Sequence, residues 1–284
     1  MISRYIFTVT AGRSGQNTLS SLLENYVHNC HVAFEEPKIN YIFKGKISNI
    51  ERHFRRKFIE THELLGRGNV LKAMASGDIK YIESISRKKI ARLNKSTHTS
   101  DFIYIDVSKY FARGLHLGFQ EFLPKFSLIH LVRDPILNMK SFLNRNKDFY
   151  LDNNQPNANC NKLIMNQKHM DKCDLYLWAW FEMTLRYESM KKLDCVEFAE
   201  EIRTDQLNNS SYIDLCLDNL GLSHDKVEMN SVRLNTNINS GYDKTIVTRS
   251  DINKFEKFIE KVPNDILSKI KYLDSYNPYL VHNI

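Results

Sequence analysis

The stretch YIFTVTAGRSGQNTLSSLLENY, residues 5–26, decides the fold class of this chain. Its first five residues form an apolar, β-branched run typical of a buried strand, and a turn of Gly, Ser and Arg follows. Leu19, Leu22 and Leu23 then recur at helical spacing. A strand that leads through a glycine-containing turn into a helix presents several backbone N–H groups and the positive end of the helix dipole. The stretch therefore predicts a site for phosphate or sulfate.

The rest of the chain alternates between strand-like and helix-like segments. Further strands are expected at residues 31–34, 102–107 and 126–135, and helices at about 47–66, 80–94, 136–144 and 172–193. This alternation predicts an α/β fold in which residues 1–284 form a single domain, with a central, mostly parallel sheet flanked by helices. Ligands of such folds bind outside the carboxyl ends of the strands. Residues around 147–171, rich in Asn, Gln and Lys, are expected to form a loop or lid before the long helix.

The composition is that of a globular protein with an excess of positive charge. Lys and Arg number 40 against 33 Asp and Glu, and the net charge of +7 favours anionic partners such as nucleotides or acidic glycans. Residues 1–9 reach a polar turn too early for a signal peptide, and no apolar run approaches the roughly 20 residues that span a bilayer. We therefore expect no transmembrane segment and a cytoplasmic location. Five cysteines without CxxC spacing predict reduced thiols, with a Cys160–Cys173 bridge as the alternative, and no metal site.

Neither of the common nucleotide-binding patterns fits the turn after the first strand. A Walker A loop requires GxxxxGK[ST], but Gly12 and Gly15 are three residues apart and Gln16 stands where the lysine belongs; the dinucleotide pattern GxGxxG is also absent. The turn instead resembles the 5'-phosphosulfate loop of sulfotransferases that use 3'-phosphoadenosine 5'-phosphosulfate (PAPS), a strand followed by (K/R)-x-G-T-T-x-L. The resemblance implies a P-loop-like PAPS sulfotransferase fold in which PAPS is bound by Gly12, Arg13, Ser14, Gly15, Gln16, Asn17 and Thr18. The amides of Gln16 and Asn17, which replace two hydroxyl residues of the family, can still donate to phosphate oxygens.

A second motif lies at the end of the strand expected at 126–135. LIHLVRDPILNMKSFLNR, residues 128–145, resembles the 3'-phosphate motif of the same family, in which an arginine ends a strand and a serine follows eight residues later. Arg133 and Ser141 have this spacing, and an arginine fork and a serine hydroxyl can converge on one phosphate dianion. The segment FAEEIRTDQLNN, residues 198–209, resembles a weaker family segment where a strand meets a short acidic turn.

Sulfuryl transfer requires a base that takes the proton of the acceptor and cations that stabilise negative charge on the leaving group. AFEEPKINY, residues 33–41, resembles the glutamate-proline turn of carbohydrate sulfotransferases, with Glu36 at the position of the base and Glu35 as its neighbouring substitute. His31 is the alternative base, because cytosolic members of the family use a histidine. The candidates for stabilising the leaving group are Lys38 and, with Ser108 beside it, Lys109.

The resemblance implies a sulfotransferase that moves the sulfuryl group of PAPS to a hydroxyl or amine of a carbohydrate or glycolipid acceptor. It would release 3',5'-adenosine diphosphate without requiring a metal, and nucleic acid is not expected as a partner. Three alternatives stay open: an ATP-dependent kinase with a P-loop-like fold, a non-catalytic polyanion-binding protein, and a protein that binds the nucleotide without transferring sulfate. Trp178 and Trp180, on the long helix, are either core residues or a stacking platform for adenine.

Overall fold

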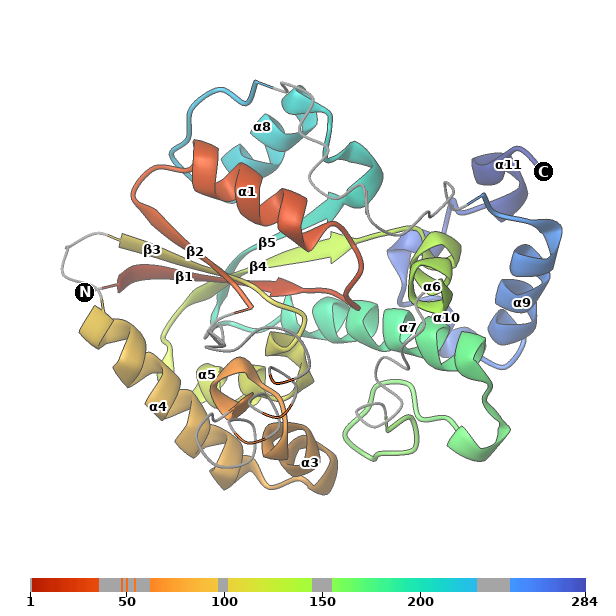
Figure 1. The fold of residues 1–284 in the computed structure, drawn as a ribbon, viewed down its shortest axis with the longest axis horizontal. Helices are drawn as coiled ribbons and strands as arrows, with labels where there is room; N and C mark the ends of the chain where they lie inside the picture. The colour runs from red at the N-terminus through yellow and green to blue at the C-terminus, as the bar shows by residue number, and fades with distance from the viewer. Residues whose placement is uncertain are drawn as a thin grey trace.

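A single five-stranded parallel sheet organises the chain. The structure is a computed structural model that describes residues 2–35, 62–96, 102–144, 155–228 and 246–284, together with Ile47, Ile50 and Phe54. The sheet order is β2-β3-β1-β4-β5 (Figure 1). The strands are β1 (Ile2–Val9), β2 (Cys30–Phe34), β3 (Phe102–Val107), β4 (Phe126–Val132) and β5 (Val196–Arg203). The prediction of an α/β fold with a parallel sheet is confirmed, and β1 to β4 lie where the sequence predicts them.

Helices connect the strands and continue beyond β5. Among the described residues they are α1 (Gln16–Tyr26), α3 (Asn69–Ser76), α4 (Ile79–Ser96), α5 (Leu115–Phe122), α6 (Pro135–Leu143), α7 (Lys172–Met190), α8 (Ser210–Asn219), α9 (Arg249–Ile259), α10 (Asn264–Leu267) and α11 (Pro278–His282). Short 3₁₀ turns are η1 (His62–Leu65), η2 (Phe111–Arg113), η3 (Gln167–His169), η4 (Thr204–Gln206) and η5 (Lys271–Leu273). The helices expected near 80–94, 136–144 and 172–193 correspond to α4, α6 and α7.

The strand order makes the carboxyl end of β1 a switch point in the topology. β1 is paired with β3 on one side and with β4 on the other. The chain first passes from β1 to β2 at one edge, returns to β3, and then crosses β1 to reach β4. Ligands of open α/β sheets bind in the crevice at such a point, beyond the ends of the strands. The turn at residues 10–15 lies there.

Alternating residues of β1 face two separate hydrophobic cores. Tyr5, Phe7 and Val9 belong to a core that also contains side chains of α5 and α7. Ile6 belongs to the opposite core, which also contains side chains of α1 and α8. Figure 1 shows α1 and α8 above the sheet and α4, α5 and α7 below it. The sheet is therefore covered on both faces, as expected when strands alternate with helices.

The helix α7 anchors the segment that precedes it. The buried Glu182 carboxylate accepts hydrogen bonds from the backbone N–H groups of Lys162, at 3.1 and 3.0 Å, and of Leu163, at 2.9 Å. Trp178 Nε1 donates to the carbonyl of Leu163 at 2.8 Å. Of the segment predicted as a loop or lid at 147–171, residues 147–154 lie outside the described part. The remainder contains η3 and is attached to α7 around Leu163.

Two further sequence predictions concern the cysteines and membrane segments. All five cysteines are free thiols in the structure, so the alternative Cys160–Cys173 bridge is wrong. Among the described helices, none combines the length and the apolar character needed to cross a bilayer.

Candidate functional site

The turn between β1 and α1 has an unusual backbone. Gly12, Arg13 and Gly15 have φ angles of 91°, 60° and 82°. Glycine adopts such angles without steric cost, whereas a non-glycine residue such as Arg13 does so uncommonly. A Cβ atom added at Gly15 would lie 2.8 Å from Leu207 Cδ1, so this position also lacks room for a side chain. Unfavourable φ values of this kind cluster at ligand-binding sites and persist where the surroundings hold them in place.

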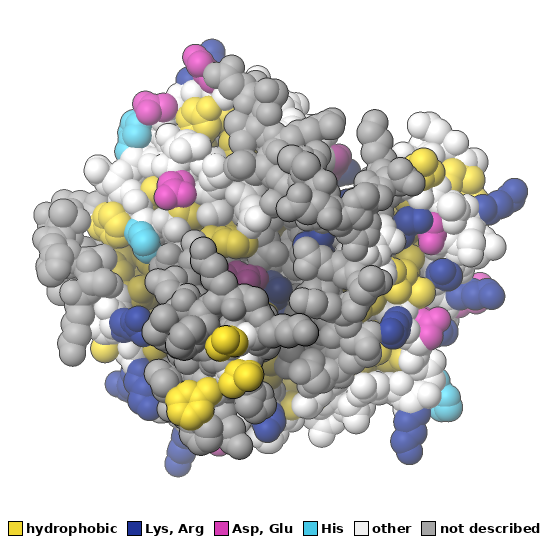
Figure 2. Space-filling view, viewed as in Figure 1, with side chains coloured by type: hydrophobic (Ala, Val, Ile, Leu, Met, Phe, Trp, Pro, Cys, Tyr) yellow, Lys and Arg dark blue, Asp and Glu magenta, His cyan; other side chains and the backbone are white. Residues whose placement is uncertain are grey.

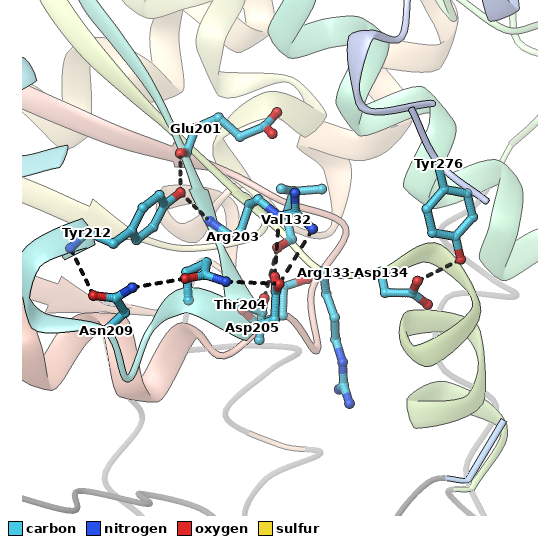
Figure 3. Close-up of polar contacts among 12 residues, drawn as sticks. Val132, Arg133, Asp134, Glu201, Arg203, Thr204, Asp205, Asn209, Tyr212 and Tyr276 are labelled. Atoms are coloured by element: carbon cyan, nitrogen blue, oxygen red, sulfur yellow. Dashed lines mark hydrogen bonds and ion pairs between the residues drawn. The ribbon is translucent and has the colours of Figure 1, made fainter. Parts of the chain in front are cut away.

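Side chains from other elements bind the carbonyl groups of the turn. Four consecutive carbonyls, those of Ala11, Gly12, Arg13 and Ser14, each accept a hydrogen bond. In that order the donors are Arg113 Nη2 at 3.2 Å, Asn138 Nδ2 at 2.8 Å, Arg133 Nη1 at 3.1 Å and Thr204 Oγ1 at 2.8 Å. Figure 3 shows Arg133 and Thr204 together at the carboxyl ends of β4 and β5. The turn is thus fixed by residues up to 190 positions away in the sequence.

The two segments that resemble phosphate motifs meet at this turn. Arg13 Nε donates to Ser141 Oγ at 3.2 Å, and Arg133 donates to the backbone of Arg13. Burial and, second, the neighbouring positive charge of Arg13 lower the pKa of Arg133. Two guanidinium groups held close together in a partly desolvated place repel each other, and a bound anion would relieve this repulsion. The geometry therefore favours an anion between the ends of β1 and β4.

The first turn of α1 adds donors on the same side of the loop. The amide groups at the start of a helix have no acceptor within the helix. The Gln16 side chain is 9% exposed, and its Nε2 has no hydrogen-bond partner among the described residues. Asn17 is exposed and Thr18 is half-buried. A buried amide donor without a partner costs free energy, which a ligand oxygen could recover.

Two of the predicted catalytic residues lie together at neighbouring strand ends. Glu35 follows β2, Lys109 follows β3, and Lys109 Nζ lies 3.4 Å from Glu35 Oε1. They meet because β2 and β3 are adjacent and parallel, with Phe34 paired to Val107. Glu35 has a φ of 48°, a second strained non-glycine residue near the carboxyl edge of the sheet. The other two predicted catalytic residues, Glu36 and Lys38, lie outside the described residues.

His31 lies away from this edge, whereas Ser108, directly after β3, lies at the edge but is buried. His31 lies near the amino end of β2, three residues before Phe34, the last residue of that strand. It is paired with Tyr104 of β3. Its ring is stacked beside Phe102 and Tyr104, with centroids 6.3 and 6.1 Å away. Ser108 is buried, and its Oγ accepts the backbone N–H of Tyr110 at 3.0 Å. Ser108 therefore has a structural partner, and His31 lies at the end of β2 opposite to Glu35.

The two tryptophans belong to the core. Trp178 and Trp180 are 4% and 2% exposed, so neither ring presents a face on which adenine could stack. Trp180 Nε1 instead donates to the carbonyl of Arg133 at 2.7 Å. Trp180 thereby helps to hold the backbone of the segment at residues 128–145.

Sequence reasoning missed the residues that support the site. Asn138 interrupts the apolar run ILNM with a polar side chain, which was the available signal that α6 buries a polar contact. Asp134 accepts the N–H of Leu137 at the start of α6, and its other oxygen accepts the Tyr276 hydroxyl at 2.6 Å (Figure 3). No local pattern relates Tyr276 to Asp134, because the two are 142 residues apart.

Comparisons with known proteins assign no family. No family model matches the chain, and no curated protein matches it. The described residues also contain no group of three or more His, Cys, Asp or Glu side chains placed to hold a metal ion.

Proposed function

We propose that this chain is a PAPS-dependent sulfotransferase that acts on a hydroxyl or amine of a carbohydrate or glycolipid acceptor. The observation that carries the proposal is the meeting of Arg13, Arg133 and Ser141, which come from two motifs 120 residues apart. Each motif resembles a family motif that binds one phosphate group of the same nucleotide. Their convergence at the switch point of the sheet supports a single ligand with two separated phosphate groups.

The residues of the turn have the chemistry that PAPS requires. The positive end of α1, the amides of the loop and Arg13 suit the 5'-phosphosulfate, while Arg133 and Ser141 suit the 3'-phosphate. The unpartnered Gln16 amide group offers a further donor. When bound, PAPS supplies a sulfuryl group whose bond to the 5'-phosphate oxygen breaks as the acceptor oxygen bonds to sulfur, which leaves 3',5'-adenosine diphosphate.

The ion pair at the ends of β2 and β3 suits proton transfer. The Glu35 carboxylate can take the proton of the acceptor hydroxyl, in the role of general base. Lys109, 3.4 Å away, fixes the position of that carboxylate and contributes positive charge near the developing negative charge. Glu36, the next residue, is the sequence-based alternative for the same role.

No specific observation favours the ATP-dependent kinase or the non-catalytic polyanion-binding protein. A P-loop kinase uses a loop lysine where this chain has Gln16. On the face that Figure 2 shows, the visible Lys and Arg side chains of the described residues lie at several places along the margins and also near the centre. A polyanion-binding protein is expected to gather these charges on one face or stripe.

Calorimetric titration with 3',5'-adenosine diphosphate, beside ATP, tests the nucleotide site. The unmodified protein should prefer the bisphosphate. Arg133→Ala and Arg13→Ala should each lower the affinity by about 10- to 100-fold, because each removes a charge-assisted hydrogen bond worth about 1.5–3 kcal/mol. Arg87→Ala, which removes an exposed arginine on α4, is the matched control and should bind normally. Absence of binding, or a preference for ATP, would refute the proposal.

Turnover of PAPS with a panel of sugar acceptors tests the base. Glu35→Gln should lower the rate of 3',5'-adenosine diphosphate release by about 10²- to 10⁴-fold and leave its binding unchanged. Glu121→Gln, an exposed glutamate on α5, serves as control. Full activity in Glu35→Gln with loss in Glu36→Gln would assign the base to Glu36. Full activity in both would contradict a carboxylate base in this turn.

A further inference from the structure

The carbonyl groups of residues 11–15, in the turn after β1, all accept hydrogen bonds. Those of residues 11–14 accept the four side-chain donors described above, and Gly15 O accepts the N–H of Leu19 at 3.0 Å as the first bond of α1. A peptide unit points its N–H opposite to its C=O. The Gly12 N–H is itself bound within the turn, to Thr10 Oγ1 at 3.2 Å. For residues 13–16, carbonyls that are bound toward the protein direct the amide groups toward the outer side. With Gly12, Arg13 and Gly15 at positive φ, successive amides can gather around an anion, as in a backbone nest.

Asn138 is the most buried of the four donors. It is 0% exposed, so it cannot touch a ligand at the surface of the loop. Its Nδ2 carries two hydrogens, and it donates to Gly12 O at 2.8 Å and to Ser14 Oγ at 3.2 Å. Ser14 Oγ in turn donates to Gly12 O at 3.2 Å. Asn138 also lies three residues before Ser141, on the same face of α6, so one helix carries both a predicted phosphate ligand and a support of the loop.

Thr204 holds the other end of the turn. Its hydroxyl lies 2.8 Å from Ser14 O and 3.0 Å from Val132 O (Figure 3), and it shares one proton between them. Its methyl group lies where a Cβ at Gly15 would come within 3.2 Å. Thr204, directly after β5, therefore joins the end of β4 to the loop, at the point where the loop enters α1.

We propose that Asn138 and Thr204 are positioning residues that preform the anion loop, and that the affinity of the loop for a sulfate or phosphate group depends on their donors. The inference rests on the proposed function only in taking the loop to bind the phosphosulfate end of the nucleotide. Each donor acts through the backbone of the loop and none of its effect requires contact with the ligand. A loop held in its binding conformation loses less conformational entropy on binding.

Paired substitutions of Thr204 separate its hydroxyl from its packing. Thr204→Val keeps the shape and removes the donor, whereas Thr204→Ser keeps the donor and removes the methyl group. Titration with inorganic sulfate, followed by the amide signals of Gly12 and Gly15 in NMR spectra, should show a loss of affinity of about tenfold in Thr204→Val. Thr204→Ser should stay within about twofold of the unmodified protein. Asn138→Leu, similar in shape to asparagine but without a donor, should behave like Thr204→Val.

The matched control is Thr184→Val. Thr184 is a buried threonine of α7 whose hydroxyl donates to Trp180 O at 3.0 Å, and its removal should leave sulfate affinity unchanged. If Asn138→Leu does not fold, the Thr204 pair decides. Equal affinities in Thr204→Val and the unmodified protein, or equal losses in Thr204→Val and Thr204→Ser, would overturn the positioning role. So would an unmodified protein that binds no sulfate.

The same titration distinguishes this inference from the proposed function. Sulfate binding that depends on the Thr204 hydroxyl, in a protein that does not bind 3',5'-adenosine diphosphate, would support the positioning role and refute the PAPS assignment. Binding of the bisphosphate with full tolerance of Thr204→Val would leave the PAPS assignment in place and refute the positioning role.

Discussion

Arg13 combines an unfavourable backbone conformation with a positive charge that is predicted to bind an anionic ligand. Its φ of 60° would suit glycine better, yet a glycine there would remove the guanidinium that contacts Ser141. The hydrogen bonds to the carbonyls of the turn offset the strain. The sequence predicts that Arg13 binds a ligand, from its place in the loop. The strain of its backbone becomes visible only in the folded structure.

A Cβ atom added at Gly15 would fit only if the buried Leu207 side chain shifted. Gly15→Ala should lower the free energy of unfolding by about 2–4 kcal/mol. Alanine at a φ of 82° costs about 1–2 kcal/mol, and its Cβ would meet Leu207 Cδ1 at 2.8 Å. Urea unfolding measures the change.

Gly77→Ala is the control for Gly15→Ala. Gly77 has a similar φ of 76°, but a Cβ there would meet nothing within 4 Å. The free energy of unfolding of Gly77→Ala should therefore fall only by the about 1–2 kcal/mol that alanine costs at a positive φ. Equal losses at the two positions would show that the turn relaxes around an added methyl group.

At the scale of elements, α6 and α9 are joined by one ion pair. Lys140 Nζ of α6 lies 2.6 Å from Asp251 Oδ2, and Asp251 forms a capping box with Thr248 at the start of α9. Burial alone would raise the pKa of Asp251, but the hydrogen bonds from Lys140 and Thr248 outweigh it and lower the pKa. The ionised carboxylate therefore stabilises the packing of α9 against α6.

A lowered pKa predicts a defined pH dependence of stability. The contribution of Asp251 is complete above its pKa in the unfolded chain, about 3.9, and is lost as the pH falls through the lower pKa of the folded state. Asp251→Asn should lose about 1 kcal/mol at pH 7, as expected for a weakened cap, and its stability should fall less steeply below about pH 4. Urea unfolding at several pH values measures both effects. Asp265→Asn, at an exposed pair with Lys269, should follow the unmodified protein; an unchanged acid dependence in Asp251→Asn would contradict the assignment.

The elements differ in how well the sequence predicts them. β4 is predictable because all seven of its residues are buried and apolar or small, apart from His130. β5 is harder to recognise because Glu197, Glu200 and Glu201 interrupt its apolar pattern. Glu201 accepts a hydrogen bond from His130 Nδ1 at 3.0 Å, a contact between neighbouring strands that local periodicity does not reveal.

At the scale of the whole molecule, the C-terminal segment supports the β4–α6 turn. The Tyr276 hydroxyl donates to Asp134, and His282 Nε2 lies 3.3 Å from the same carboxylate oxygen. Burial, followed by the charge of Asp134, raises the pKa of Tyr276, so its hydroxyl stays a donor. Figure 1 shows α9, α10 and α11 grouped beside α6 and α7. Residues near the end of the chain thus hold the turn that carries Arg133.

Tyr276→Phe should destabilise the protein by about 1.5–3 kcal/mol in urea unfolding. The substitution removes a hydrogen bond to a charged group in a partly buried place, so Asp134 Oδ2 loses the hydroxyl donor of Tyr276. Tyr279→Phe removes a hydroxyl that donates to Glu256 at 3.2 Å and provides the control, for which no measurable change is expected. Equal stability of Tyr276→Phe and the unmodified protein would show that the segment is held by its apolar contacts.

The sequence by itself determined the parallel α/β architecture and the position of the turn between β1 and α1. Strand and helix patterns depend on neighbouring residues, so local periodicity carries this information. Only the tertiary structure decided which distant side chains meet: Arg13 with Ser141, Glu35 with Lys109, and Asn138 with Gly12. These contacts follow from the strand order β2-β3-β1-β4-β5, which places side by side strand ends that are far apart in the sequence. No local pattern encodes that order, because it results from how the two hydrophobic faces of the sheet are covered by helices from the whole chain.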